Sequence, residues 1–328
     1  MKAAILQSAG AAPVYGDFGE PPAEVAGEGG EVVQMVAAAI HHVTRSVASG
    51  RHYSRGGVFP SIPGLNAVAR DARGTLVFTS SGPPPWGTFA ERIPSPAAMR
   101  FPLPDGAEPE AVAAGINPGM ASWLPLTAWQ AGAGTAGGLG TLLVLGVTGM
   151  SGYLAAQNAR LLGAARVVGA GRSEPGLERA AAAGAETVRL TGDRAADAQA
   201  IGDALGEDTP SLVLDFVWGP VAEAAFQALS GQAFREDAPE TKYVQIGALG
   251  GPEAAVPSAL LRSRRLTISG SGAGSVPAAT IRAEIPRYIQ LIADGSVQVP
   301  YRTFPLSDVA AAWEESAESG PRVVLVRD

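Results

Sequence analysis

"TLLVLGVTGMSGYLAAQNARLLG", residues 141–163, contains the pattern from which the fold of this chain is predicted. A short apolar run typical of a buried strand leads into a turn with glycines at 146, 149 and 152, and a helical pattern follows. Glycines there allow a ligand to approach the backbone closely, and the free N–H groups of a helix N-terminus bind phosphate. The G-x-x-G-x-x-G spacing is a weak pattern alone, but strand, turn and helix follow in the order that a dinucleotide-binding unit requires. We predict contacts to the dinucleotide from Thr148, Gly149, Met150 and Ser151.

The residues on either side of this stretch alternate between strand and helix patterns. Strand-like runs lie at 141–147, 165–171, 186–190, 211–217, 242–247 and 266–272, and helical runs at 151–163, 174–183, 193–205, 219–229 and 258–263. This alternation predicts βαβ units in a doubly wound parallel sheet of Rossmann type. The residues before Asn117 instead form short strand patterns between Gly, Pro and Ser clusters, and a helix is expected to begin at Asn117.

Composition excludes several classes of function. The 328 residues carry a formal net charge of -7 with no clustered basic residues, so nucleic acid is an unexpected partner. There is no cysteine, which excludes disulfides, a thiol nucleophile and thiolate-bound metal. We find no signal-peptide pattern and no apolar run long enough for a bilayer, and therefore expect a cytoplasmic protein without a membrane partner.

The end of the second strand, "VVGAGRSE", indicates which nicotinamide dinucleotide binds. Arg172, between Gly171 and Ser173, offers a guanidinium to a 2'-phosphate, which favours NADP(H). Glu174 is the competing feature, because a carboxylate there is also suited to a ribose 2'-hydroxyl. Two further segments are expected at the cofactor because they end later strands: Ile246 and Gly247, and then Gly270, Ser271 and Gly272.

The chain resembles the zinc-independent medium-chain dehydrogenase/reductases, in their quinone oxidoreductase-like branch, over nearly its whole length. The resemblance is carried by "LLVLGVTGMSGYLAAQNARLLGA" with "VVGAGR", by "SLVLDFVWGPVAEAAFQAL", "YVQIGALGG" and "LLRSRRLTISGSGAGS", and by "FPLSDVAAAWEESAES". It implies an α/β fold in which a Rossmann domain, residues 120–281, is inserted into a GroES-like, partly open β-barrel catalytic domain, residues 1–119 and 282–328.

The resemblance also indicates where a zinc enzyme of this family would hold its metal, and this sequence departs there. The turn "IHHVTRSVASG" has no cysteine, and the usual Gly-His-Glu is replaced by Gly64-Leu65-Asn66. His41 and His42 would point to opposite faces of a strand, so they are not expected to share an ion. We expect no metal. The asparagine and aspartate that quinone reductases often have in this turn are matched by His41 and Thr44.

Candidate catalytic residues are those that can supply a proton or hydrogen-bond a carbonyl. Tyr53 resembles in position a tyrosine near the family's substrate cleft, but a solvated loop tyrosine is an equal alternative. His42 or His41 is a second possible proton donor, against the commoner structural role of a lone histidine. For the substrate pocket we select Trp86, Trp123 and Asn117, whose alternatives are core packing for the tryptophans and a helix N-cap for the asparagine.

The expected function is an NADPH-dependent, zinc-independent reductase that transfers hydride to a quinone or an α,β-unsaturated carbonyl. One alternative is a pathway-specific tailoring reductase, and another is a weakly catalytic NADPH-binding sensor or partner protein. The partner is then a small-molecule substrate. We also expect a homodimer, because the strand at 264–272 should lie at a sheet edge, although Arg262, Arg264 and Arg265 favour the monomeric alternative.

Overall fold

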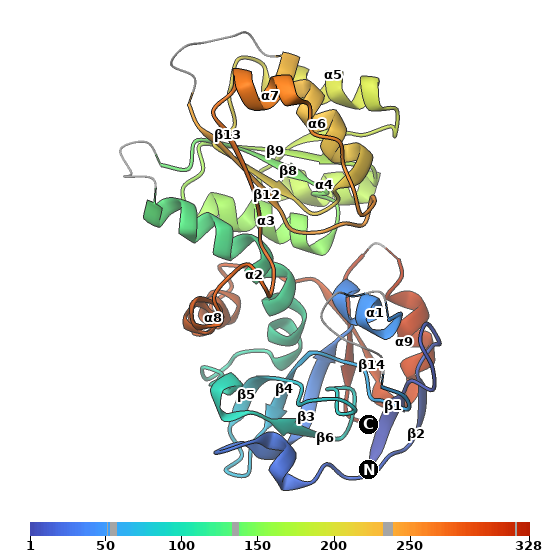
Figure 1. Cartoon of the computed structure of the whole chain (residues 1–328). Coiled ribbons are helices and arrows are strands. Elements are labelled where there is room, and N and C mark those ends of the chain that lie inside the picture. The colour runs from blue at the N-terminus through green and yellow to red at the C-terminus, as the bar shows by residue number, and fades with distance from the viewer. Residues whose placement is uncertain (51, 53–57, 133–137, 232–238, 319) are drawn as a thin grey trace. The chain divides into compact units, whose positions relative to one another are not determined.

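The computed structural model of the chain describes residues 1–50, 52, 58–132, 138–231, 239–318 and 320–328 (Figure 1). Internal contacts divide the chain into two compact units, Met1–Pro118 with Arg282–Asp328, and Gly119–Ile281. The boundaries fall inside helix α2 (Pro109–Gly132) and helix α8 (Ala278–Ala293). Each unit has its own sheet and its own buried core.

Six parallel strands form the sheet of the second unit, in the order β10-β9-β8-β11-β12-β13. Their bounds are β8 (Thr141–Leu145), β9 (Arg166–Gly171), β10 (Glu186–Arg189), β11 (Leu212–Asp215), β12 (Thr241–Gln245) and β13 (Leu266–Gly270). The chain starts at the central strand β8, winds outward to β10 and then outward on the other side from β11 to β13, which is the doubly wound order of dinucleotide-binding folds. The predicted Rossmann-type fold class is confirmed.

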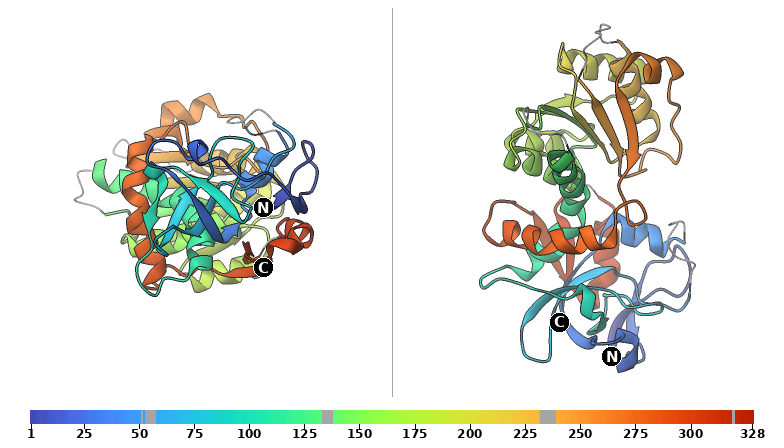
Figure 2. Two further views of the ribbon diagram at one scale, coloured as in Figure 1. Left: turned by 90° about the horizontal axis from the view of Figure 1, so that it is seen from below. Right: turned by 60° about the vertical axis from the view of Figure 1, so that its left-hand side comes forward.

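Helices cover both faces of this sheet (Figure 2). Leu143 and Leu145 of β8 face a core shared with α5 (Arg194–Leu205), α6 (Gly219–Gly231) and α7 (Ser258–Ser263). Their neighbours in sequence, Leu142 and Val144, face the opposite core, shared with α2, α3 (Met150–Leu161) and α4 (Glu174–Ala182). Because successive strand residues point to opposite faces, a strand covered on both sides is apolar throughout, which explains the run "LLVL".

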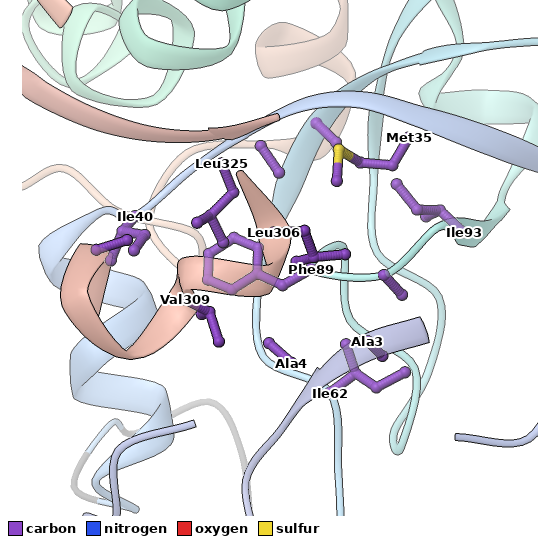
Figure 3. Packing of buried hydrophobic residues seen from close by; sticks show 14 of the residues in the cluster. Ala3, Ala4, Met35, Ile40, Ile62, Phe89, Ile93, Leu306, Val309 and Leu325 are labelled. Atoms are coloured by element: carbon purple, nitrogen blue, oxygen red, sulfur yellow. The ribbon is translucent and has the colours of Figure 1, made fainter. Parts of the chain in front are cut away.

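The first unit is mainly β structure. A seven-stranded sheet has the order β14-β15-β3-β4-β5-β7, with β6 paired to β3, and β1 and β2 form a separate pair. The bounds are β1 (Lys2–Ile5), β2 (Val14–Asp17), β3 (Glu31–Ala39), β4 (Asn66–Arg70), β5 (Leu76–Ser80), β6 (Arg92–Ser95), β7 (Phe101–Pro102), β14 (Tyr301–Pro305) and β15 (Arg322–Val326), with helices α1 (His42–Ala48) and α9 (Val309–Glu315). Figure 3 shows the core of this unit, where Phe89, Leu306 and Leu325 pack together.

Two local expectations are wrong. Helix α2 begins at Pro109, not at Asn117, because Val112, Ala113 and Ile116 on its earlier turns are buried and their burial outweighs the cost of Pro118 in the interior. The two histidines are not on a strand either, because β3 ends at Ala39. Residue His41 instead precedes α1, where its carbonyl accepts a hydrogen bond from Arg45 N at 3.2 Å.

Candidate functional site

The carboxyl ends of the central strands lie at one edge of the parallel sheet. Asp215 at the end of β11 is paired in register with Leu145 of β8 and with Gln245 of β12, and Gln245 is paired with Gly270 of β13. The segments that follow these residues therefore meet at this edge. They contain the glycine turn, residues 146–152, and the predicted cofactor residues Ile246, Gly247, Gly270, Ser271 and Gly272.

The glycine turn packs too closely on α3 to admit a side chain at its end. A Cβ atom on Gly152 would contact Gly146 O and lie 2.5 Å from Val147 Cα. Gly146 itself has a φ of 87°, the left-handed region that glycine adopts without strain. The turn is anchored to β9 by Gly146 N and Val147 N, which donate to Ala170 O at 2.8 and 3.1 Å. These contacts require glycine where the sequence has it.

The N-terminus of α3 leaves backbone donors unused. Tyr153 N donates to Gly149 O at 2.9 Å, so the N–H groups of the three residues before Tyr153 have no acceptor within the helix. The N-cap is Gly149, which has no side chain that could accept a hydrogen bond from these N–H groups. The three donors are those of Met150, Ser151 and Gly152, and together with the helix dipole they form a site suited to an anion.

The later strand ends lie beside this turn. Ile246 N and Gly247 N both donate to Asp215 O, at 2.7 and 3.1 Å. A Cβ on Gly247 would contact Phe216 O and lie 3.0 Å from Phe216 C, so only glycine fits. At the end of β13, Ser271 N donates to Gln245 O at 2.9 Å. Three groups of predicted cofactor residues thus lie at one edge of the sheet: residues 148–151, the pair Ile246 and Gly247, and residues 270–272.

The residues after β9 supply an exposed cation. Arg172 is exposed, and no ion pair involves it within the described ranges. Glu174 is held by Arg189, whose Nη1 lies 2.7 Å from Glu174 Oε2, with both side chains exposed. Arg189 ends β10 and is paired in register with Gly171. Ser173 is the N-cap of α4, but its hydroxyl makes no cap bond.

A separate pocket lies in the first unit. Its lining is mostly apolar and includes Thr44, Phe59, Leu65 and Trp86. The Trp86 ring meets Phe18 edge to face, with 5.3 Å between the ring centroids. Thr44 is the buried polar residue of this pocket: it is 1% exposed, and its Oγ1 has no hydrogen-bond partner. The pocket is therefore apolar apart from the side chains of Thr44 and Ser61.

The surroundings of both histidines disfavour the protonated ring. His41 is 2% exposed, and burial, then the charges of Arg322 and His42, lower its pKa well below the ordinary value of 6.5. The Ala113 backbone approaches the ring and opposes this shift, but neither ring nitrogen makes a hydrogen bond of good geometry. His42 reaches the surface, but its ring is still partly desolvated. This desolvation, followed by the charges of Arg322 and Arg45, lowers the pKa of His42 too. His41 is enclosed by protein, whereas His42 reaches the surface, and both stay predicted proton donors.

The other residues predicted for catalysis or for the substrate pocket do not lie together in the structure. Tyr53 lies outside the described residues. Trp123 is 1% exposed, so it packs inside the protein and does not line the pocket of the first unit. Asn117 is half-buried inside α2 rather than at its start. Of the three residues selected for a substrate pocket, Trp86 is the one that lines the pocket described above.

Two notable residues were not singled out from the sequence. Arg322 is 9% exposed; its Nη1 donates to Ile40 O at 3.1 Å, while its Nε is buried without a partner. Burial lowers the Arg322 pKa to about 10. The second residue is Arg189, which pairs with Glu174. No local pattern marks either one, because each arginine meets its partner only through strand pairing.

The donors near the family's zinc position do not fit a zinc ion. The chain has no cysteine, His41 is enclosed, and Leu65 presents an apolar side chain to the pocket. Across the described ranges, no group of three or more histidines and carboxylates is placed to hold a metal ion. Within those ranges no helix has the length and apolar character needed to cross a membrane.

Known proteins resemble this chain in sequence. Residues 152–294 match the family model described as zinc-binding dehydrogenase. A curated relative, the probable NADPH-dependent quinone reductase tdiC of Emericella nidulans, is 32% identical over 229 residues, which is 67% of this chain and 62% of the relative. The chain thus matches less than two thirds of that relative's length.

Solved structures extend the likeness to the whole chain. The quinone oxidoreductase from Thermus thermophilus, also solved with NADPH, has a TM-score of 0.80 and 26% identity, with coverage of 99% of this chain and 100% of that one. Mycobacterial Rv1454c complexed with NADPH has a TM-score of 0.79 and 21% identity, with coverage of 99% of both chains. At that identity the second likeness shows the fold alone.

Proposed function

Because the chain belongs to the medium-chain dehydrogenase/reductase family, in its quinone oxidoreductase-like branch, we propose that it is an NADPH-dependent oxidoreductase. The observation that carries this proposal is the glycine turn, where no side chain fits at Gly152 and three helix N–H groups have no helical acceptor. A pyrophosphate is an anion of the kind that such N–H groups bind. When bound, NADPH supplies a hydride; the chain's own residues bind and orient it.

The pairing of Glu174 supports NADPH rather than NADH. A carboxylate at this strand end selects NADH by accepting the ribose 2'-hydroxyl, but here Arg189 occupies the carboxylate. Arg172 is then the exposed charge next to Gly171, and a guanidinium binds a 2'-phosphate through charge-assisted hydrogen bonds. Ser173 has a hydroxyl that α4 does not use. These three features together favour a phosphorylated ribose.

The pocket of the first unit supports a quinone or an α,β-unsaturated carbonyl as acceptor. Its apolar walls, including Trp86 and Phe59, suit a flat molecule with few polar groups. These acceptors spread negative charge over a conjugated system, so reduction proceeds without a metal to polarise the carbonyl. The unsuitable donor set near Leu65 supports zinc independence. Tyr53, His42 and His41 stay the predicted proton donors, and homodimer assembly and cytoplasmic location stay predictions.

Two measurements test this proposal. Calorimetry should give NADPH at least about tenfold tighter binding than NADH, and Arg172→Ala should remove most of that difference because a charge-assisted bond contributes about 1.5–3 kcal/mol. Equal affinities in the unaltered protein would contradict the NADP(H) assignment. Steady-state NADPH oxidation with a panel of quinones and enones tests the reaction. Tight NADPH binding without turnover on any of them would favour the sensor alternative.

A further inference from the structure

One turn of the second unit lies between the two segments proposed to contact the cofactor. It consists of residues 216–219 and follows β11, which is the strand between β8 and β12. Phe216 N donates to Leu145 O at 3.1 Å, one residue before the glycine turn. On the other side, Gly250 N donates to Val217 O at 2.7 Å, three residues after Gly247. The 216–219 turn is thus bonded to both segments.

Packing leaves this turn no room to move independently. A Cβ on Gly146 would lie 2.6 Å from Val217 Cγ2, and a Cβ on Gly247 would contact Phe216 O. The 216–219 turn therefore occupies the space that side chains at the two glycines would need. Any displacement of Val217 or Phe216 changes the shape of the glycine turn or of the segment at Gly247.

A buried carboxylate fixes the shape of the turn. Asp215 is 0% exposed, and its Oδ1 accepts hydrogen bonds from Val217 N and Trp218 N, both at 2.8 Å. Its Oδ2 accepts the Tyr243 hydroxyl at 2.5 Å, and Tyr243 is also 0% exposed. Within the described part of the chain Asp215 has no ion pair, so hydrogen bonds alone satisfy it. Burial raises the pKa of Asp215, whereas these three donors lower it.

The turn needs this restraint because its backbone is strained. Trp218 has a φ of 60°, and it is the one non-glycine residue with positive φ among the described positions. Its ring meets Phe226 and Tyr243 edge to face, with centroid distances of 6.0 and 6.2 Å. Such a conformation persists only where neighbours determine it, and strained residues of this kind gather at ligand sites.

We propose that Asp215 and Tyr243 are positioning residues for cofactor binding: their hydrogen bond holds the 216–219 turn in the shape that keeps the glycine turn and the Gly247 segment correctly placed. The inference rests on the proposed NADPH function. Without the Tyr243 hydroxyl, the carboxylate loses one of its three donors and the strained turn relaxes. NADPH must then restore the bound shape at the expense of its own binding free energy.

Tyr243→Phe is the central test, and Thr241→Val is its matched control. Thr241 is the first residue of the same strand, two positions before Tyr243, and its hydroxyl donates to Pro210 O at 2.7 Å in a buried bond. Both variants remove one buried hydroxyl, so both should lower the melting temperature. Calorimetry should show NADPH binding about tenfold weaker in Tyr243→Phe and within about twofold of the unaltered protein in Thr241→Val.

A second ligand makes the test specific. Adenosine 2'-monophosphate carries the 2'-phosphate but no phosphate on the 5' side, so its binding should depend on Arg172 and not on the glycine turn that the 216–219 turn supports. Its affinity should stay within about twofold in Tyr243→Phe, because well-separated contacts act independently. Asp215→Asn should be the mildest change, about threefold for NADPH, since an amide oxygen still accepts from Val217 N and Trp218 N.

The results distinguish failure of the proposed function from failure of the positioning role. If the unaltered protein does not bind NADPH, the proposed function fails and this inference fails with it. If it binds NADPH and Tyr243→Phe and Asp215→Asn bind it equally well, the positioning role alone is overturned. Equal weakening of NADPH and of adenosine 2'-monophosphate in Tyr243→Phe also overturns it, because that pattern reports general loss of structure. Asp215→Asn provides a second folded variant should Tyr243→Phe prove unstable.

Discussion

Replacing Gly152 by alanine should separate the binding role of the glycine turn from ordinary packing. The new Cβ would lie 2.5 Å from Val147 Cα, about 1 Å inside the 3.4 Å at which ordinary contact begins. The three nearest atoms all belong to the backbone, so α3 and the glycine turn must separate by roughly 1 Å, a change that costs about 1–3 kcal/mol as overpacking.

The separation also moves the helix N–H groups away from the phosphate. Losing one charge-assisted hydrogen bond costs about 1.5–3 kcal/mol, so the NADPH dissociation constant should rise roughly 10- to 150-fold. Calorimetry measures this directly, and thermal unfolding measures the packing cost separately. A folded Gly152→Ala protein that binds NADPH within about threefold of the unaltered protein would refute the reasoning.

Gly202→Ala is the matched control for this substitution. Gly202 lies inside α5, and a Cβ there would have no heavy atom within 4 Å. Alanine is the better helix former, so this variant should gain about 0.5–1 kcal/mol of stability. Its NADPH affinity should not change. A loss of affinity in Gly202→Ala would show that the assay responds to helix substitutions in general.

Four further predictions follow from the described contacts. Arg189→Ala should release Glu174 and reduce the NADPH over NADH preference about threefold, the effect expected of an exposed ion pair; an unchanged ratio of dissociation constants would contradict this. Turnover should survive dialysis against EDTA, and a loss that zinc restores would refute zinc independence. Because the folded state lowers the pKa of His41, the unfolded chain protonates first below pH 6.5, and the free energy of unfolding should fall by up to about 1.4 kcal/mol per pH unit. His41→Gln should flatten this slope in thermal unfolding between about pH 7.5 and pH 5, and an equal slope would implicate other groups. Light scattering should give the mass of two chains for the unaltered protein and of one chain for Ile268→Pro, since Ile268 lies on the edge strand β13; a dimer that survives the substitution excludes this route of assembly.

The parallel sheet and its glycine turn were predictable because their signals are local. Leu142 to Leu145 are buried on both faces of the sheet, and such a strand is a continuous apolar run. The glycine at 152 is needed for a contact with residues only five or six positions earlier. The position of β13 at the sheet edge also followed, because the doubly wound order places the last strand there.

The features that sequence reasoning missed depend on pairing between distant segments. Arg322 donates to Ile40 across 282 positions of sequence, and its burial depends on β15 pairing with β3. Asp215 meets Tyr243 only because β11 and β12 are neighbours. The start of α2 was misplaced for another reason: Asn-Pro is a strong local signal for a helix start, and burial of the preceding turn outweighs it.

The prolines in the walls of the first unit's pocket affect how a ligand loses its hydration shell. Pro63, Pro84 and Pro85 line the pocket, and proline has no backbone N–H to offer. A polar group that enters along these walls gives up its bonds to water and finds no amide donor on these residues in return. A sugar, with hydroxyls on every side, is penalised all around its ring. A planar quinone or enone carries only one or two carbonyl oxygens, so it loses far fewer hydrogen bonds to water.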